Sequence, residues 1–167
     1  MRRLVILVSG LVLTLSIVAP VAAIRQVGGG GANFVALLNG QNEVNAQGVR
    51  GQGDPDGFGI AFVNVNDDVN RVCWFITVAG IEPAHLAHIH QAPKDVNGPV
   101  RVDLMPPLPN PTSSGCTNDV PEERIDNILN NPAGHYVNVH NPTYPAGALR
   151  GQLKRLFGGM APPPPAT

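Results

Sequence analysis

Apolar and polar residues alternate with a period of two along most of the chain between residues 34 and 153. In segment 58–65, Phe58, Ile60 and Phe62 fall on one face of an extended chain, and the small or branched residues between them fall on the other. This period is typical of β-strands. The pattern predicts strands at 34–38, 58–65, 71–78, 85–91, 100–104, 136–140 and 148–153. Gly, Pro, Asn and Asp cluster between these strands and indicate turns.

One segment departs from this period. Residues 121–130 place Ile125, Ile128 and Leu129 on one stripe, with Pro121 at the first helical position and Asp119 as a candidate cap. The preceding segment, 106–118, is rich in Pro, Ser and Asn, so we expect no regular structure there. Segment 71–78 is the most apolar strand, and we expect it at the centre of its sheet. The whole pattern predicts an all-β fold, an antiparallel sandwich or flattened barrel with one short inserted helix.

The two ends of the chain differ from the predicted β domain in their residue pattern. Residues 1–23 begin with Arg2 and Arg3, continue with a long apolar run and end in small residues, which is typical of a signal peptide. The alternative is an uncleaved membrane anchor, since the run is just long enough to cross a bilayer. Residues 24–33 are a Gly-rich linker, and residues 158–167 are a Pro-rich tail that we expect to be disordered. We therefore expect a secreted, periplasmic or cell-envelope protein.

Charge and cysteine content narrow the class of protein. The formal net charge is −1, and the basic residues are scattered, so we expect no nucleic-acid partner. The two cysteines, Cys73 and Cys116, form a disulfide in an oxidising compartment. The alternative, two thiolate metal ligands, lacks the close cysteine spacing of such sites.

Histidines carry the candidate chemistry. His88 and His90 are two residues apart in one predicted strand, so both rings lie on the same face. His140 ends a second short strand, and the three rings together predict a metal site. Imidazole sets suit copper, our first choice, or zinc. A fourth ligand could come from His135 or His85, although both have the opposite strand parity.

Other candidate residues surround these histidines. Tyr136 and Asn138 share the face of His140 and are predicted to support the ligands or fill the core. Arg101 and Arg150 are candidates for steering an anion toward an open metal position, or else for ordinary surface contacts. We find no catalytic triad and no phosphate-binding glycine loop.

Several blocks in order resemble one known family. They are Ala-Leu-Leu-Asn-Gly at 36–40, Ala-His-Ile-His at 87–90, Asn-Gly-Pro-Val at 97–100, Tyr-Val-Asn-Val-His at 136–140 and Leu-Arg-Gly-Gln-Leu at 149–153. Over residues 34–157 the sequence resembles the CHRD domain, named after chordin. This resemblance implies an extracellular, immunoglobulin-like β module, and in chordin the domain is associated with growth-factor binding.

A more distant likeness concerns the metal. The pattern His88-Ile89-His90 followed by Val137-Asn138-Val139-His140 is similar to the copper ligands of Cu,Zn superoxide dismutases, which implies a Greek-key arrangement. The bridging histidine and zinc-loop aspartate of those enzymes have no counterpart here. We therefore expect an exported copper-binding protein, in copper handling or redox chemistry. The alternatives are a structural or protein-interaction module of the cell envelope without metal, and a superoxide dismutase-like enzyme.

Overall fold

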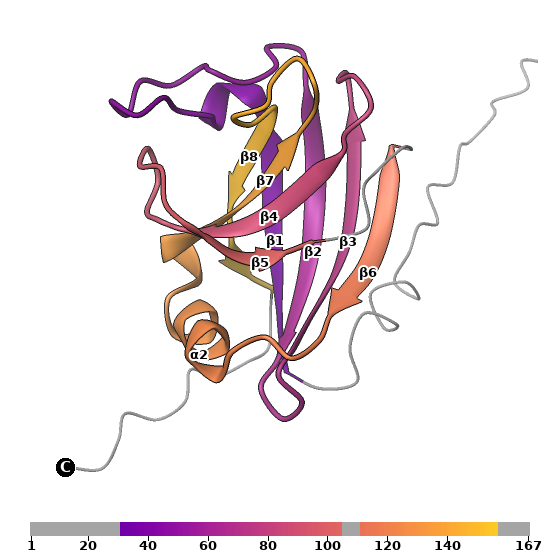
Figure 1. Cartoon of the computed structure of the whole chain (residues 1–167), viewed down its shortest axis with the longest axis vertical. Coiled ribbons are helices and arrows are strands. Elements are labelled where there is room, and N and C mark those ends of the chain that lie inside the picture. The colour runs from indigo at the N-terminus through magenta and orange to yellow at the C-terminus, as the bar shows by residue number, and fades with distance from the viewer. Residues whose placement is uncertain (1–30, 105–110, 157–167) are drawn as a thin grey trace, which may run out of the picture.

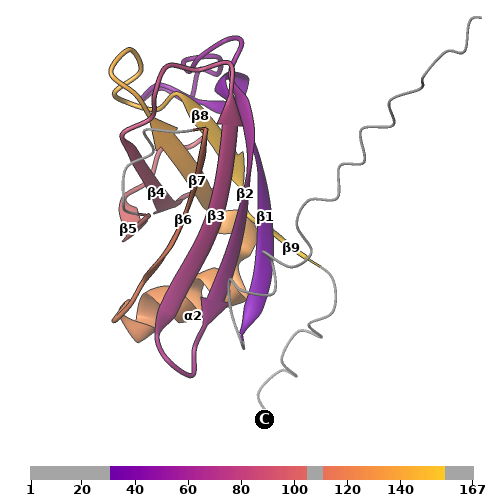
Figure 2. The same cartoon turned by 90° about the vertical axis from the view of Figure 1, so that its right-hand side faces the viewer.

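Two layers of antiparallel strands make up the fold. The computed structural model describes residues 31–104 and 111–156. Figure 2 shows β1 (Ala32–Asn39), β2 (Phe58–Asn66) and β3 (Arg71–Ala79) in one layer, facing the layer that contains β4 (Leu86–Gln91) and β7 (His135–His140). The remaining strands are β5 (Val100–Asp103), β6 (Thr112–Thr117), β8 (Leu149–Gln152) and β9 (Lys154–Arg155). The predicted all-β, antiparallel class is confirmed.

The strands form one continuous sheet that curls into a nearly closed, flattened barrel. Its order is β5-β4-β7-β8-β1-β2-β3-β6, and β9 pairs with β1. The Thr117 hydroxyl of β6 donates a hydrogen bond to the Asp103 carbonyl of β5, so the two edge strands meet. Figure 1 shows β4 and β5 crossing in front of the long strands, with several connecting loops at the top and the turn between β2 and β3 at the opposite end.

The interior of the barrel is apolar because each strand turns alternate residues inward. Phe34, Ala36 and Leu38 of β1 are buried in the same core as Ala61, Val63 and Val65 of β2. Ala87 and Ile89 of β4 and Val137 and Val139 of β7 come from the opposite layer. The residues between these positions therefore face outward, including the three histidines of the predicted metal site.

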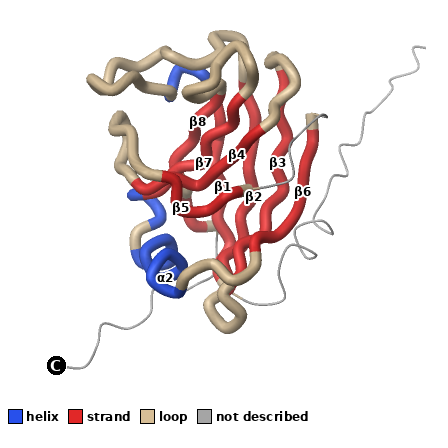
Figure 3. Tube along the Cα trace, viewed as in Figure 1, coloured by secondary structure: helices blue, strands red, loops and turns tan. Residues whose placement is uncertain are grey.

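Helix α2 (Glu122–Asn130) closes one end of the barrel (Figure 3). Ile125 and Ile128 are fully buried in the core, and Leu129 packs against it from the edge. The predicted cap is wrong. Pro121 occupies the cap position, and no side chain caps the helix. Asp119 lies in a left-handed turn, at φ 54°, two residues before that position, so its carboxylate does not cap the helix.

The disulfide between Cys73 and Cys116 is present, as predicted. The structure of the segment that carries Cys116 differs from the prediction. Residues 112–117 form β6, which pairs with β3 in full register, although irregular structure was expected there. Ser, Thr and Gly give this strand little apolar signal, and ladder hydrogen bonds with the disulfide hold it in place. Since β6 is an edge strand, β3 lies next to the sheet edge and not at its centre.

Two small 3₁₀ turns complete the described elements: η1 (Gly40–Asn42) and η2 (Pro132–Gly134). No helix in the described part of the chain is long and apolar enough to cross a membrane. The predicted signal peptide, most of the Gly-rich linker and the Pro-rich tail lie outside the described residues.

Candidate metal centre

Three histidines meet on the outer face of the sheet, where β4 and β7 pair. The register places His88 opposite Asn138, His90 opposite Tyr136 and His140 opposite Leu86. Because neighbouring strands point their side chains to the same side at paired positions, His88, His90 and Asn138 share one face with Tyr136 and His140. The residues between them pack into the core, so the sheet fixes the direction of all three rings.

The distances suit a single metal ion. One ring nitrogen from each of His88, His90 and His140 lies within 4.8 Å of the other two. His88 Nδ1 and His140 Nε2 are 3.1 Å apart. Metal–nitrogen bonds of about 2.0–2.1 Å keep two ligand nitrogens no more than about 4 Å apart, so small ring rotations complete the site. The cluster can therefore hold a metal ion.

Each ring is also held through its other nitrogen. His90 Nδ1 lies 2.9 Å from the carbonyl oxygen of Gly98, and His140 Nδ1 lies 3.1 Å from that of Pro145. His88 Nε2 faces the Asp103 carboxylate at 3.7 Å. Since a carbonyl oxygen only accepts, Nδ1 of His90 and of His140 carries the proton. Their lone pairs are then on Nε2, the atom turned toward the cluster, as in histidine metal ligands supported by outer groups.

One ring nitrogen in this cluster has no protein partner in the part of the chain that the structure describes, and two others share a single proton. The buried Nε2 of His90 has no hydrogen-bond partner among the described residues. His88 Nδ1 and His140 Nε2 face each other, so one proton between them must serve both. A metal ion would replace that proton and also occupy the lone pair of His90, which removes the cost of leaving a buried acceptor unpaired.

Burial keeps these rings neutral. It lowers the pKa of His88, although the nearby Asp103 carboxylate opposes the shift. Burial also lowers the pKa of His90, against the hydrogen bond to Gly98. The same cause, with the charge of His88, lowers the pKa of His140 from 6.5 to about 4. Neutral imidazole is the form that binds metals, so the ligand form prevails at neutral pH.

A stack of flat groups supports His90 from the side. The His90 and Tyr136 rings are nearly parallel, with an interplanar angle of 9° and centroids 4.9 Å apart. The Arg150 guanidinium carbon lies 3.5 Å from the centroid of the Tyr136 ring. Because β7 lies between β4 and β8, Tyr136 separates His90 from Arg150. Arg150 is 1% exposed and donates to the carbonyls of Pro93 and Val96, which anchors the loop that also carries Gly98.

A buried carboxylate lies behind the cluster. Glu43 is 2% exposed, and its Oε2 accepts a hydrogen bond of 2.6 Å from Asn138 Nδ2. Burial raises the pKa of Glu43, against the hydrogen bonds from Val44 and Asn138 and the charge of Arg150. Gly147 lies against this pair, and a Cβ there would meet Glu43 Oε2 at 2.3 Å. The loop that supplies the Pro145 carbonyl therefore approaches the network closely because residue 147 has no side chain.

The remaining two histidines lie elsewhere. His135 has the opposite parity on β7 and is buried, with Nδ1 2.9 Å from the Asn131 carbonyl. Burial lowers the pKa of His135, against that hydrogen bond. His85 is exposed just before β4, and its backbone N–H donates to the His140 carbonyl. The structure brings neither ring into the group of three nitrogens within 4.8 Å.

Comparison with known proteins identifies the domain that holds this cluster. The CHRD domain pattern matches residues 34–153 of the 167-residue chain. The chain belongs to the CHRD domain family. The matched region includes all three clustered histidines and both disulfide cysteines. No curated protein matches the chain.

Membership in the CHRD family also bears on the compartment. CHRD domains are of the extracellular type, and the disulfide between Cys73 and Cys116 indicates an oxidising compartment.

The groups around the ligands in this CHRD domain were not predicted from the sequence. Asp103, Glu43 and the carbonyls of Gly98 and Pro145 come from other segments than the histidines. For Asp103 the alternation of residues 100–103 was a usable signal, since Arg101 and Asp103 share one face of β5.

Proposed function

We propose that this CHRD-domain protein binds one transition-metal ion, most favourably copper, through His88, His90 and His140. The observation that carries the proposal is the convergence of three neutral imidazoles. The other nitrogens of His90 and His140 are hydrogen-bonded to backbone carbonyls, and that of His88 faces the Asp103 carboxylate. Ligands oriented in advance lose little freedom when the metal binds, so the affinity is high for a three-ligand site.

The donor set favours copper over other metals. Divalent copper has the highest affinity of the first-row metals for nitrogen ligands, above both nickel and zinc. The described residues contain no free cysteine that would favour a thiolate site. Three ligands leave a coordination position for water or for a redox partner.

The proposed setting is outside the cytoplasm. In this proposal residues 1–23 are a signal peptide, or an uncleaved anchor, and residues 24–33 link it to the β domain of residues 34–157, which the 158–167 tail follows. The oxidising compartment indicated by the disulfide supports export. The protein then acts in binding or handling copper in the periplasm, the cell envelope or the medium.

A metal titration of the purified protein tests this function. We expect one Cu(II) or Zn(II) ion per chain in the wild type, and a loss of at least about 100-fold in affinity in the variant His88→Ala/His90→Ala. The matched control is His85→Ala, which removes an exposed histidine of the same segment and should keep the stoichiometry at one. Wild-type stoichiometry and affinity in the double variant would refute the proposed site.

A second candidate is a protein-interaction module without metal. It is favoured by apolar side chains on the outer face of β1 and β2, where Leu37 is 63% and Phe58 is 61% exposed. Exposed apolar groups of this kind often mark contact surfaces. The same titration separates the two candidates, since this module predicts no tight metal binding in the wild type.

Superoxide dismutation is a special case of copper binding. Two arginines, Arg101 and Arg150, were considered for steering an anion toward the metal. Neither is an unengaged surface group. Arg150 is buried, and Arg101 donates a hydrogen bond of 2.7 Å to Gln91 Oε1. A dismutase assay on the copper-loaded protein, with His88→Ala/His90→Ala as the reference, tests this activity.

A further inference from the structure

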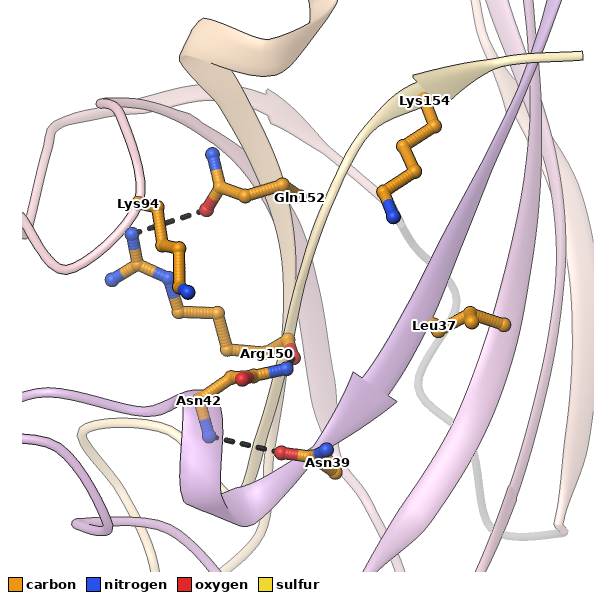
Figure 4. Close-up of a pocket in the computed structure, with 7 residues that line it drawn as sticks. All are labelled: Leu37, Asn39, Asn42, Lys94, Arg150, Gln152 and Lys154. Atoms are coloured by element: carbon orange, nitrogen blue, oxygen red, sulfur yellow. Dashed lines mark hydrogen bonds between the residues drawn. The ribbon is translucent and has the colours of Figure 1, made fainter.

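The chain contains two lysines, Lys94 and Lys154, and both line the same cavity. They are 60 positions apart in sequence, Lys94 on the loop after β4 and Lys154 on β9. The cavity has a volume of about 340 Å³, at the small end of the range for ligand sites, roughly 300–1,000 Å³. Figure 4 shows Lys94 in front of Arg150 on one side of the view and Lys154 on the other side.

The positive charges around this cavity exceed the negative ones. No Asp or Glu of the described residues is among its lining groups, which are Leu37, Asn39, Asn42, Lys94, Arg150, Gln152 and Lys154. Neither lysine forms an ion pair within the described part of the chain. The two carboxylates that influence Arg150 are engaged otherwise. Asp95 is paired with Arg50 at 3.3 Å, and Glu43 is buried against Asn138.

The other lining groups offer hydrogen bonds and one apolar surface. Arg150 donates to Gln152 Oε1, and the Asn42 backbone N–H donates to Asn39 Oδ1, as the dashed lines in Figure 4 mark. These bonds fix the guanidinium and the amides in place. The Nδ2 group of Asn39 has no partner among the described residues and remains a donor. Leu37, which is 63% exposed, adds an apolar wall.

We propose that this cavity binds a small ligand carrying a carboxylate or sulfate together with hydroxyl groups, such as a hexuronate. Lys94 and Lys154 contact the anionic group, Asn39 donates to a hydroxyl, and Leu37 packs against the apolar face of the ring. The site shares no ligand with the histidine cluster, so it does not depend on the proposed metal binding.

The small number of lysines makes the test selective. Reductive methylation with ¹³C-formaldehyde labels Lys94, Lys154 and the N-terminal amine and keeps their charges. In the full chain, with a chelator present and ionic strength held constant, sodium glucuronate should shift both lysine resonances along one saturating curve. Glucose, which lacks the carboxylate, should leave them unchanged, and inorganic sulfate should compete with glucuronate. Tighter binding of a galacturonate oligomer than of the monomer would identify the natural ligand as part of an acidic polysaccharide. Equal affinity of the two would identify it as a free sugar acid.

Substitutions complete the test. Lys94→Gln/Lys154→Gln should weaken glucuronate binding, measured by calorimetry, by at least roughly tenfold, because two charge-assisted contacts are lost. The matched control Arg71→Gln removes a charge at the start of β3, outside the cavity, and should keep wild-type affinity. Unchanged binding in the lysine variant would overturn the proposal. So would lysine resonances that do not move, or that move equally with glucose.

Discussion

At the scale of single residues, the candidate metal centre depends on what each imidazole does with its second nitrogen. Gly98 and Pro145 provide carbonyl oxygens that only accept, which fixes the proton of His90 and of His140 on Nδ1. His88 has a carboxylate in that place, Asp103, which is 3.7 Å away and whose side chain is 68% exposed. The three ligands are thus held with unequal strength, and His88 is the least constrained.

Asp103→Asn is the substitution that probes this weakest support. Removing the carboxylate takes away the charge that favours a positive His88 ring and its bound metal. We expect metal affinity to fall by up to about tenfold, at the low end for such outer groups because Asp103 is exposed to solvent. A competition titration at low salt measures the effect. Asp67→Asn, a control at an exposed turn, should have no effect, and an equal loss in both variants would mean that only net charge matters.

The lowered pKa of His140 predicts a pH dependence of stability in the metal-free protein. Its pKa falls from 6.5 to about 4 on folding, so between these values the unfolded chain binds a proton that the folded chain does not. This contribution to stability is therefore present above pH 6.5 and is lost as the pH falls toward 4. It amounts to about 3 kcal/mol.

Urea unfolding at pH 7 and pH 4.5, with chelator, measures this dependence. The variant His140→Gln should lose less stability than the wild type between the two pH values. The control His85→Ala should follow the wild type. Parallel curves for His140→Gln and the wild type would show that other groups cause the acid sensitivity.

At the scale of elements, the sequence pattern was informative where one side of a strand is apolar. Strands β2, β4 and β7 have clear alternation, and their predicted ranges agree with the structure to within one residue at each end. The same alternation predicted that His88 and His90 share a face. It could not predict β6, whose Ser, Thr and Gly residues lack an apolar side. Nor could it predict which strand lies beside β4, because pairing over long sequence separations depends on the whole sheet.

Strand β6 is held to the barrel by pairing with β3 and by the disulfide, and this predicts a large effect of reduction. The bridge joins residues 43 positions apart. A loop of this length corresponds to a stabilisation of about 4 kcal/mol by restriction of the unfolded chain. We expect Cys73→Ala/Cys116→Ala to lower the free energy of unfolding by about 3–4 kcal/mol, measured by urea denaturation. The control is the wild type treated with reductant, which should lose a similar amount. A change below about 1 kcal/mol would show that the ladder alone holds β6.

At the scale of the whole molecule, the candidate metal centre joins parts of the chain that are distant in sequence. His88 and His140 are 52 residues apart, and the oxygens that orient the rings come from β5 and from two loops. The described elements must therefore be folded together before the three nitrogens converge. A metal ion that binds this arrangement, and not the unfolded chain, stabilises the entire fold.

This coupling predicts that metal raises the melting temperature of the whole domain. At a free metal concentration 100 times the Kd, the stabilisation is about 2.7 kcal/mol. For a domain of this size that corresponds to a rise of roughly 10 °C, which calorimetry of the apo and copper-loaded protein can measure. His88→Ala/His90→Ala should show no rise, and His85→Ala should show the full rise. An equal rise in all three proteins would place the stabilising metal outside the cluster of His88, His90 and His140.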